Sequence, residues 1–278
     1  MNIIDFHTHI FPEDVVRRRS NFFNDGGFRS LYDNEKSLLL SHGELLEAMG
    51  RGGISGSVCM GFPWEQEKYC RSQNEYFSQV ADENRGALYT FGSVPVRGGA
   101  GVYNAVKEIS ALGLHGIGEI AFYEWGDTVE RERYLREIFD CAGGFSLPVC
   151  LHVNEPVGHR YPGKYDTDMA MLSAVITAHP DLRVILAHWG GGILFYELMP
   201  EVKAAFGNVF YDTAATPFLY DPAVYSAALA IVSSRKILFG SDYPLLAPGR
   251  YFSVIEEQVE EYDRQNILYG NALGILNG

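Results

Sequence analysis

The sequence contains no apolar run that could cross a membrane and no recognisable export signal. A membrane helix needs about 18 or more consecutive apolar residues, and no stretch approaches that length. Residues 1–7 also lack the basic segment and the long apolar segment of a signal peptide. We therefore expect a cytoplasmic protein that has no membrane partner.

Positive charge is also scarce. The 278 residues include 22 Lys and Arg against 35 Asp and Glu, which gives a net charge of −13. Nucleic-acid-binding proteins concentrate Lys and Arg on one face, and the only dense basic run is Arg17-Arg18-Arg19. This composition argues against a nucleic-acid partner and favours a small-molecule substrate.

Cysteine is rare, and its four positions show neither Cys-x-x-Cys nor zinc-knuckle spacing. Two of the cysteines, Cys59 and Cys150, lie in apolar runs, where a free thiol behaves as a small hydrophobic side chain. We expect structural thiols in a reducing compartment rather than a disulfide framework.

Short apolar runs closed by Gly, Pro or polar residues recur along the whole chain. Most are continuous Val/Ile/Leu stretches, which is typical of parallel strands buried on both faces. The predicted strands are residues 3–7, 57–61, 88–94, 116–120, 149–153, 183–188, 209–212 and 237–240.

Helical periodicity separates these runs, so that each strand and helix form one βα unit. The predicted helices are residues 43–49, 69–82, 102–112, 129–141, 168–178, 222–232, 252–262 and 271–276. Eight such units without a linker predict one α/β domain over residues 1–278, a (β/α)₈ TIM barrel. The long first interval, residues 10–53, is predicted to be an extended loop over the barrel mouth.

The strongest chemical signal is Asp5-Phe6-His7-Thr8-His9. Side chains of a strand alternate between its two faces, so His7 and His9 point the same way. Two imidazoles on one face at the end of a strand can share a metal ion.

Four more ligand-type side chains end later strands: Glu119, His152, His188 and Asp242. Each alone has an ordinary structural explanation, such as a hydrogen-bonded core histidine or an aspartate that caps a helix. Together they occupy the rim where barrel enzymes keep their active sites, and burying so many ionisable groups requires a neutralising cation. The sequence therefore predicts a divalent metal centre, with zinc expected and manganese, iron or nickel compatible with the same ligands.

The motifs that carry these residues resemble the amidohydrolase superfamily, and most closely its amidohydrolase 2 branch. The resemblance extends over the whole chain and rests on residues 5–9, 151–155, 186–191, 239–244 and 266–272. It implies that His7 and His9 hold the metal, with Asp242 as a further ligand and proton-transfer group.

The roles of the remaining ligands depend on the subgroup that the chain resembles. In a one-metal arrangement, similar to the aminocarboxymuconate-semialdehyde decarboxylases, His152 completes the ligand sphere and His188 lies just outside it. In a two-metal arrangement, similar to the TatD-like hydrolases, Glu119 bridges and the two histidines bind the second ion. The segment 116–120 resembles the TatD-like motif, although Glu119 could instead orient a histidine.

These expectations favour a metal-dependent hydrolase that cleaves a C–N, C–O or P–O bond with metal-activated water. Asp242 would accept the proton of that water and return it to the leaving group, and His188 would help to polarise the substrate oxygen. The alternative is a non-oxidative decarboxylase, in which Asp242 and His188 would deliver a proton to the carbon that loses CO₂.

A decarboxylase substrate carries a carboxylate, so basic groups near the metal would matter. Arg160 and Lys164 lie in the Gly/Pro-rich segment after the fifth predicted strand and are candidates for binding it. Tyr123 follows the fourth strand and could form part of an aromatic pocket wall. A homo-oligomer is the default expectation for such a chain.

Overall fold

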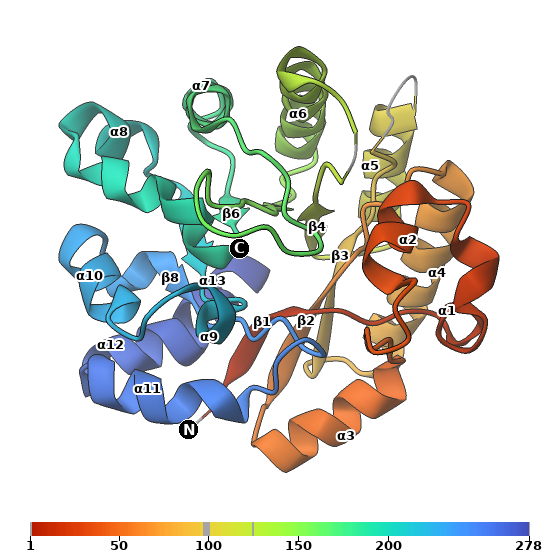
Figure 1. Cartoon of the computed structure of the whole chain (residues 1–278), viewed down its shortest axis with the longest axis horizontal. Coiled ribbons are helices and arrows are strands. Elements are labelled where there is room, and N and C mark those ends of the chain that lie inside the picture. The colour runs from red at the N-terminus through yellow and green to blue at the C-terminus, as the bar shows by residue number, and fades with distance from the viewer. Residues whose placement is uncertain (1, 97–100, 124, 278) are drawn as a thin grey trace.

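A computed structural model describes residues 2–96, 101–123 and 125–277. Eight parallel strands neighbour one another in chain order, with helices around them, so the predicted (β/α)₈ barrel is confirmed (Figure 1). The strands are β1 (Ile4–Thr8), β2 (Gly56–Met60), β3 (Leu88–Gly92), β4 (Gly116–Ile120), β5 (Val149–Leu151), β6 (Val184–Leu186), β7 (Val209–Asp212) and β8 (Ile237–Leu238).

The first and last strands meet at a seam between β1 and β8. The Phe6 N–H donates to the Phe239 carbonyl over 2.7 Å. Farther along, Thr8 forms an isolated parallel bridge with Tyr243. These contacts bring the two ends of the sheet together, so that the carboxyl ends of all eight strands share one rim.

Seven of the eight predicted helices begin and end within three residues of their expected positions, whereas α1, α2, α8 and α9 were not predicted. No helix in the described part of the chain is both long and apolar enough to cross a membrane. They are α1 (Glu13–Arg17), α2 (Gly26–Tyr32), α3 (His42–Gly52), α4 (Glu67–Glu83), α5 (Gly101–Ala111), α6 (Thr128–Gly144), α7 (Met169–Thr177), α8 (Pro200–Ala205), α9 (Thr216–Leu219), α10 (Val224–Ile231), α11 (Gly249–Gln258), α12 (Glu261–Gln265) and α13 (Asn271–Leu276).

Two sequence predictions need correction. The predicted helix 252–262 is two helices, α11 and α12, because Val259 adopts an extended backbone and buries its side chain between them. The interval 10–53 is largely helical rather than one loop. Asp25 begins α2 by accepting a hydrogen bond from the Phe28 N–H over 3.1 Å.

The segment before α3 is held by an aromatic cluster at the rim. Phe28 stacks on Trp64 with ring centroids 4.8 Å apart, and Phe11 and Phe62 both pack edge-on against the same two rings. Burial of these large rings explains why the segment folds instead of remaining an open loop.

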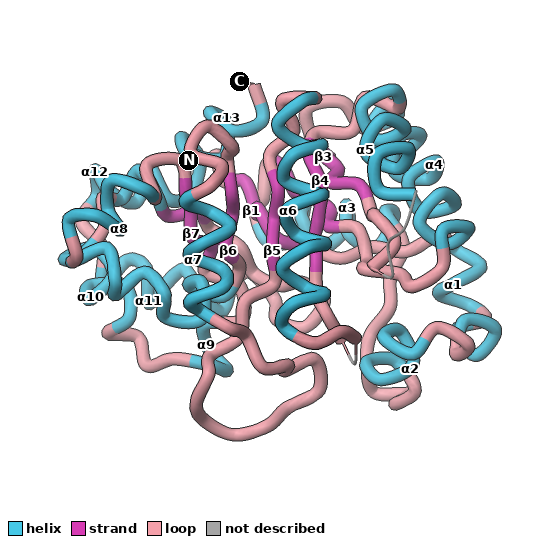
Figure 2. The backbone as a smooth tube through the Cα atoms, turned by 90° about the horizontal axis from the view of Figure 1, so that it is seen from above, coloured by secondary structure: helices cyan, strands magenta, loops and turns pink. Residues whose placement is uncertain are grey.

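The amino-terminal half of the barrel interior is apolar. Phe6 meets Phe91 edge to face at 5.6 Å, within one buried cluster that spans most of the strands and reaches Ala272 and Ile275 of α13. Figure 2 shows α13 and both chain ends on one side of the strands, with α2 and α9 on the opposite side. The site residues lie toward that opposite side, at the carboxyl ends of the strands.

Candidate metal centre

The first group of ligand-type atoms comes from the seam. The pairing register of β1 with β2 shifts between Asp5 and Thr8, an irregularity of the kind that re-aims side chains. The Nε2 atoms of His7 and His9 lie 3.2 Å apart. Asp242 Oδ1 lies 3.1 Å from His9 Nε2 and 3.9 Å from His7 Nε2. These three residues form the first triad.

The second group comes from β4 and from the ends of β5 and β6. His152 Nδ1 lies 2.9 Å from Glu119 Oε1 and 3.1 Å from His188 Nε2. His188 Nε2 is in turn 3.5 Å from the same carboxylate oxygen. All three side chains are buried. Glu119, His152 and His188 form the second triad.

Glu119 lies between the two triads. Its Oε1 is 3.7 Å from His7 Nε2, and its Oε2 is 4.0 Å from His9 Nε2. One carboxylate therefore reaches donor atoms of both groups, which is the position that a bridging ligand would need.

The orientation of the imidazoles fits a cation in each triad. His188 Nδ1 lies 3.1 Å from the Ala214 carbonyl, which can only accept, so this nitrogen carries the proton. His7 Nδ1 likewise faces a carboxylate oxygen of Asp212 at 2.8 Å. Both Nε2 lone pairs are then aimed at their triads, and nitrogen and carboxylate ligands of this kind suit zinc, manganese or iron.

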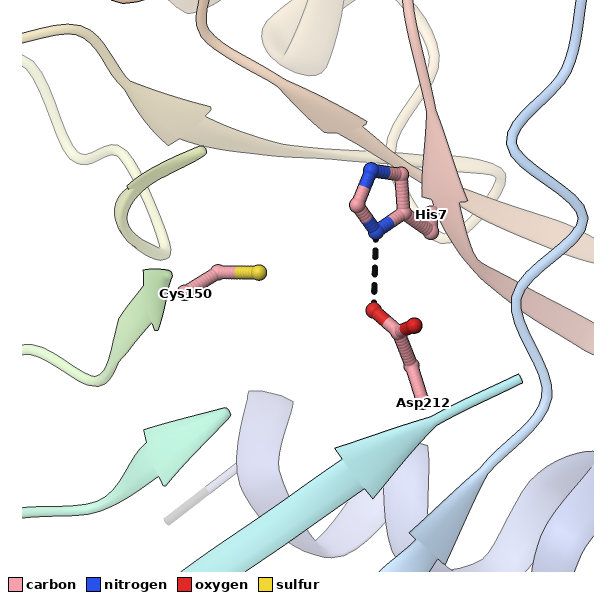
Figure 3. Close-up of side chains that lie close together, drawn as sticks. All are labelled: His7, Cys150 and Asp212. Atoms are coloured by element: carbon pink, nitrogen blue, oxygen red, sulfur yellow. Dashed lines mark hydrogen bonds and ion pairs between the residues drawn. The ribbon is translucent and has the colours of Figure 1, made fainter. Parts of the chain in front are cut away.

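Asp212 at the end of β7 contacts both His7 and His188, and Figure 3 shows its contact with His7. Its Oδ2 accepts from His7 Nδ1, and its Oδ1 accepts from the His188 N–H over 2.9 Å. The thiol of Cys150 also points toward this pair in Figure 3. Burial raises the pKa of Cys150 well above its usual range, which favours the neutral thiol over the thiolate that binds metals.

The Glu119 and Asp242 carboxylates of the two triads remain ionised. Burial alone would raise the pKa of Glu119, but the attraction of the neighbouring His152 and His7 imidazoles outweighs burial and holds the pKa well below its ordinary value. Burial opposes ionisation of Asp242 as well, yet the hydrogen bond with His9 and the attraction of the His7 imidazole bring its pKa to about 2. Both carboxylates can therefore serve as anionic ligands, and Asp242 can accept a proton.

Two of the ligands lie on left-handed backbone. The φ angle of His188 is 57° and that of Asp242 is 64°, a region that costs a non-glycine residue about 1–3 kcal/mol. Hydrogen bonds hold these conformations: the Asp242 N–H donates to the His7 carbonyl over 2.9 Å, and Asp212 holds the His188 N–H. Strain kept in place at the rim is typical of a functional site.

All triad residues except His7 line the floor of a cavity of about 600 Å³. Tyr32, Phe62 and Tyr123 are among the side chains that line its wall. Its volume falls within the roughly 300–1,000 Å³ of small-molecule sites.

The two predicted loop cations lie elsewhere. Arg160 pairs with Asp166 at 2.8 Å, and the Lys164 Nζ donates to the Val157 carbonyl over 2.5 Å. The described residues that line the cavity include neither of them, because each side chain is engaged by its own loop. Their predicted contact with substrate needs this correction. Lys36 is the only Lys or Arg among the described lining residues.

Comparison with known proteins identifies the family. A model of the amidohydrolase family matches residues 4–277. The chain belongs to the amidohydrolase family. None of the curated proteins matches this amidohydrolase by sequence.

Several solved structures share the fold of this amidohydrolase over the full chain. The 5-carboxyvanillate decarboxylase of Sphingomonas paucimobilis is 15% identical, covers 99% of each chain and has a TM-score of 0.77. The 2,6-dihydroxybenzoate decarboxylase of Rhizobium is 15% identical over 100% of this chain and 99% of its own, with a TM-score of 0.70.

A third structure, a dihydroxybenzoic acid decarboxylase of Polaromonas sp. JS666, contains manganese and the inhibitor 2-nitroresorcinol. It is 15% identical, covers 100% of this chain and 97% of its own, and has a TM-score of 0.72. At these identities the likeness establishes the fold that this amidohydrolase shares with the three enzymes.

Asp212 and most of the cavity wall of this amidohydrolase were not predicted from the sequence. Asp212 ends the predicted strand 209–212, so the strand-end rule that selected Glu119 and Asp242 would have selected it as well. Tyr32 had no such signal, because it belongs to α2, within the interval that we expected to be a loop.

Proposed function

We propose that this amidohydrolase is a metal-dependent, non-oxidative decarboxylase of a small aromatic carboxylic acid. The observation that carries the proposal is a floor of buried metal-ligand side chains beneath a wall of aromatic rings, including Phe62 and Tyr123. The three similar enzymes of the same fold, all decarboxylases of aromatic acids, support this choice over hydrolysis.

His7, His9 and Asp242 would hold the catalytic ion. A bound divalent cation supplies positive charge that attracts the substrate oxygens and stabilises charge developing on them. The aromatic side chains of Phe62 and Tyr123 in the wall favour an aromatic ring.

Asp242 and His188 are the proton-transfer residues in this proposal. When the bond between the ring carbon and the carboxylate breaks, its electron pair stays on the ring carbon and CO₂ leaves. A proton must then reach that carbon, and both side chains end at the cavity floor. Protonated His188 would donate this proton and become neutral, and ionised Asp242 would take a replacement proton from water and return it to His188.

The test is an assay of manganese- and zinc-loaded protein with a panel of hydroxybenzoic and carboxyvanillic acids. We expect release of CO₂ and, in D₂O, one deuterium at the carbon that lost it. Asp242→Asn is the matched control, because it keeps the side-chain size and removes the charge. Failure of the metal-loaded protein to release CO₂ from any of these acids would overturn the proposal.

A hydrolase is the second candidate, and the second triad favours it. Glu119, His152 and His188 would hold a second ion, with Glu119 shared between both ions. In that arrangement Asp242 would accept the proton of the attacking water and pass it to the leaving group.

Metal content separates the two candidates. Inductively coupled plasma mass spectrometry of the wild type and of Glu119→Ala counts ions per chain and identifies the metal. Two ions that fall to one would support the bridged hydrolase and direct screening to esters, amides and phosphodiesters. One ion in both proteins would leave Glu119 outside the ligand sphere and favour the decarboxylase.

A further inference from the structure

The cavity is larger than a single-ring acid requires. Such an acid has about ten heavy atoms, and at no more than about 30 Å³ per heavy atom, the share of a water molecule in the liquid, it fills about 300 Å³. The cavity of about 600 Å³ therefore leaves about half of its volume outside the space above the triads.

The outer part of the cavity has an unusual lining. Leu38, Phe218 and Leu245 all line it, yet their exposed fractions are 63%, 53% and 56%. They come from three separate segments, which follow β1, β7 and β8 respectively. We call these three residues the apolar lip. Large apolar side chains that converge on the mouth of a cavity mark a binding surface, because leaving them in water is unfavourable.

The backbone beneath the lip is fixed. The Leu245 N–H donates to the carbonyl of Asp242 over 2.8 Å, so the backbone of Leu245 is tied directly to a metal-ligand candidate. The Phe218 N–H donates to the Ala215 carbonyl over 2.9 Å, and the Arg250 guanidinium lies 5.8 Å from the Phe218 ring centroid. The Phe218 and Leu245 positions of the lip are thus preformed at a fixed place relative to the floor, which lowers the entropic cost of binding.

We propose that the apolar lip is a specificity site for an apolar extension of the substrate, a second ring or an alkyl chain that projects away from the reacting group. This inference rests on the proposed function for the identity of the reacting group, a carboxylate held at the floor. The substrate class is then an aromatic acid longer than one ring, whose far end covers Leu38, Phe218 and Leu245.

Binding measurements test the lip without requiring turnover. Isothermal titration calorimetry of manganese-loaded protein compares benzoate with biphenyl-4-carboxylate, and benzamide with biphenyl-4-carboxamide. We expect the longer member of each pair to bind at least 10-fold more tightly. Leu38→Ser, Phe218→Ser and Leu245→Ser should each weaken the longer ligands about 3- to 10-fold and the shorter ones less than 2-fold.

Leu198→Ser is the matched control, because Leu198 is 58% exposed and is not among the described lining residues. This variant should bind the short and the long ligands with the same affinities as the wild type. Equal affinity for short and long ligands, or equal weakening of both by the lip variants, would overturn the inference. So would failure of both biphenyl compounds to bind.

The same measurements separate this inference from the proposed function. Tighter binding of the longer amide, without tighter binding of the longer carboxylate, would support the role of the lip. It would contradict the proposal that the substrate is a carboxylate. Sedimentation of the same variants tests a different occupant of the lip. A wild-type dimer that dissociates in the lip variants would assign the surface to a second copy of the chain and overturn the proposal.

Discussion

The two halves of the barrel interior are built from the same strands and have opposite chemistry. At the amino-terminal half, Phe6 and Phe91 belong to an apolar cluster that α13 closes. At the carboxyl-terminal half, ionisable side chains meet at the floor of the cavity, and Asp242 lies on strained backbone. Burial of apolar side chains in the amino-terminal half stabilises the fold. This stabilisation offsets the cost of burying several ionisable side chains close together in the carboxyl-terminal half.

We therefore expect stability and activity to depend on different positions along the same strand. A substitution in the apolar half should change the free energy of unfolding while the site remains intact. A substitution at the rim should change activity or metal affinity at nearly constant stability. Four predictions test the separation, from the largest expected effect to the smallest.

Asp242→Asn should lower turnover of an accepted substrate by about 10²- to 10⁴-fold, because the amide can no longer accept the proton. The free energy of unfolding in urea should stay close to that of the wild type, since the substitution preserves size. Metal content is measured on the same preparation to separate loss of the proton acceptor from loss of the ion. Near-wild-type turnover would contradict the role of Asp242.

Phe91→Ala should lower the free energy of unfolding by about 3–5 kcal/mol, because it removes a fully buried ring and leaves a cavity beside Phe6. Urea denaturation measures this change, and Phe91→Leu should lower the free energy of unfolding by less than Phe91→Ala does. Metal content per folded molecule should be unchanged. Loss of metal without loss of stability would show that the two halves are not separable.

Asp212→Asn should weaken metal affinity by about 10- to 100-fold, because it disturbs the hydrogen bonds that orient His7 and His188. Competition with a chromophoric chelator measures the change. Cys150→Ala is the control in the same neighbourhood, and it should leave the affinity unchanged if the thiol is not a ligand. A larger loss of metal affinity in Cys150→Ala than in Asp212→Asn would indicate that the thiol binds the metal.

The smallest effect concerns His115, which immediately precedes β4 at the amino-terminal side. Burial lowers the pKa of His115. The unfolded chain therefore takes up a proton first as the pH falls below about 6.5, and the native state loses stability until its own pKa is reached.

One proton limits this slope to about 1.4 kcal/mol per pH unit. Urea denaturation between pH 7.5 and 5.5 should show a shallower pH dependence for His115→Asn, which keeps an acceptor for the Thr90 N–H. Identical profiles for the two proteins would exclude a contribution from His115.

Strand positions could be predicted because apolar runs record burial directly. The predicted ends of the strands were less accurate where the chain turns toward the site. The run 183–188 ends as a strand at Leu186, and His188 adopts a left-handed conformation so that its ring reaches the second triad. Local pattern cannot reveal that turn, since hydrogen bonds to Asp212 and Ala214 hold it.

The cavity wall was harder to predict than its floor. The floor residues share one rule, a ligand-type side chain at a strand end, whereas Tyr32 and Leu38 are positioned by the packing of residues 10–53 onto the rim. That packing depends on contacts such as Phe28 with Trp64, which are distant in sequence. Candidate metal ligands can therefore be selected from the sequence, whereas the shape of the cavity that selects a substrate can be described only from the structure.

The seam between β1 and β8 has a consequence for how the protein assembles. Its two contacts join residues near opposite ends of the chain, and the Asp242 N–H donates to His7 at the same seam. Contacts of such long sequence separation are slow to form, because loop-closure entropy must be lost first. Binding of a metal ion by the first triad should therefore be a late event in refolding. An ion bound there would stabilise the closed barrel against opening at the seam.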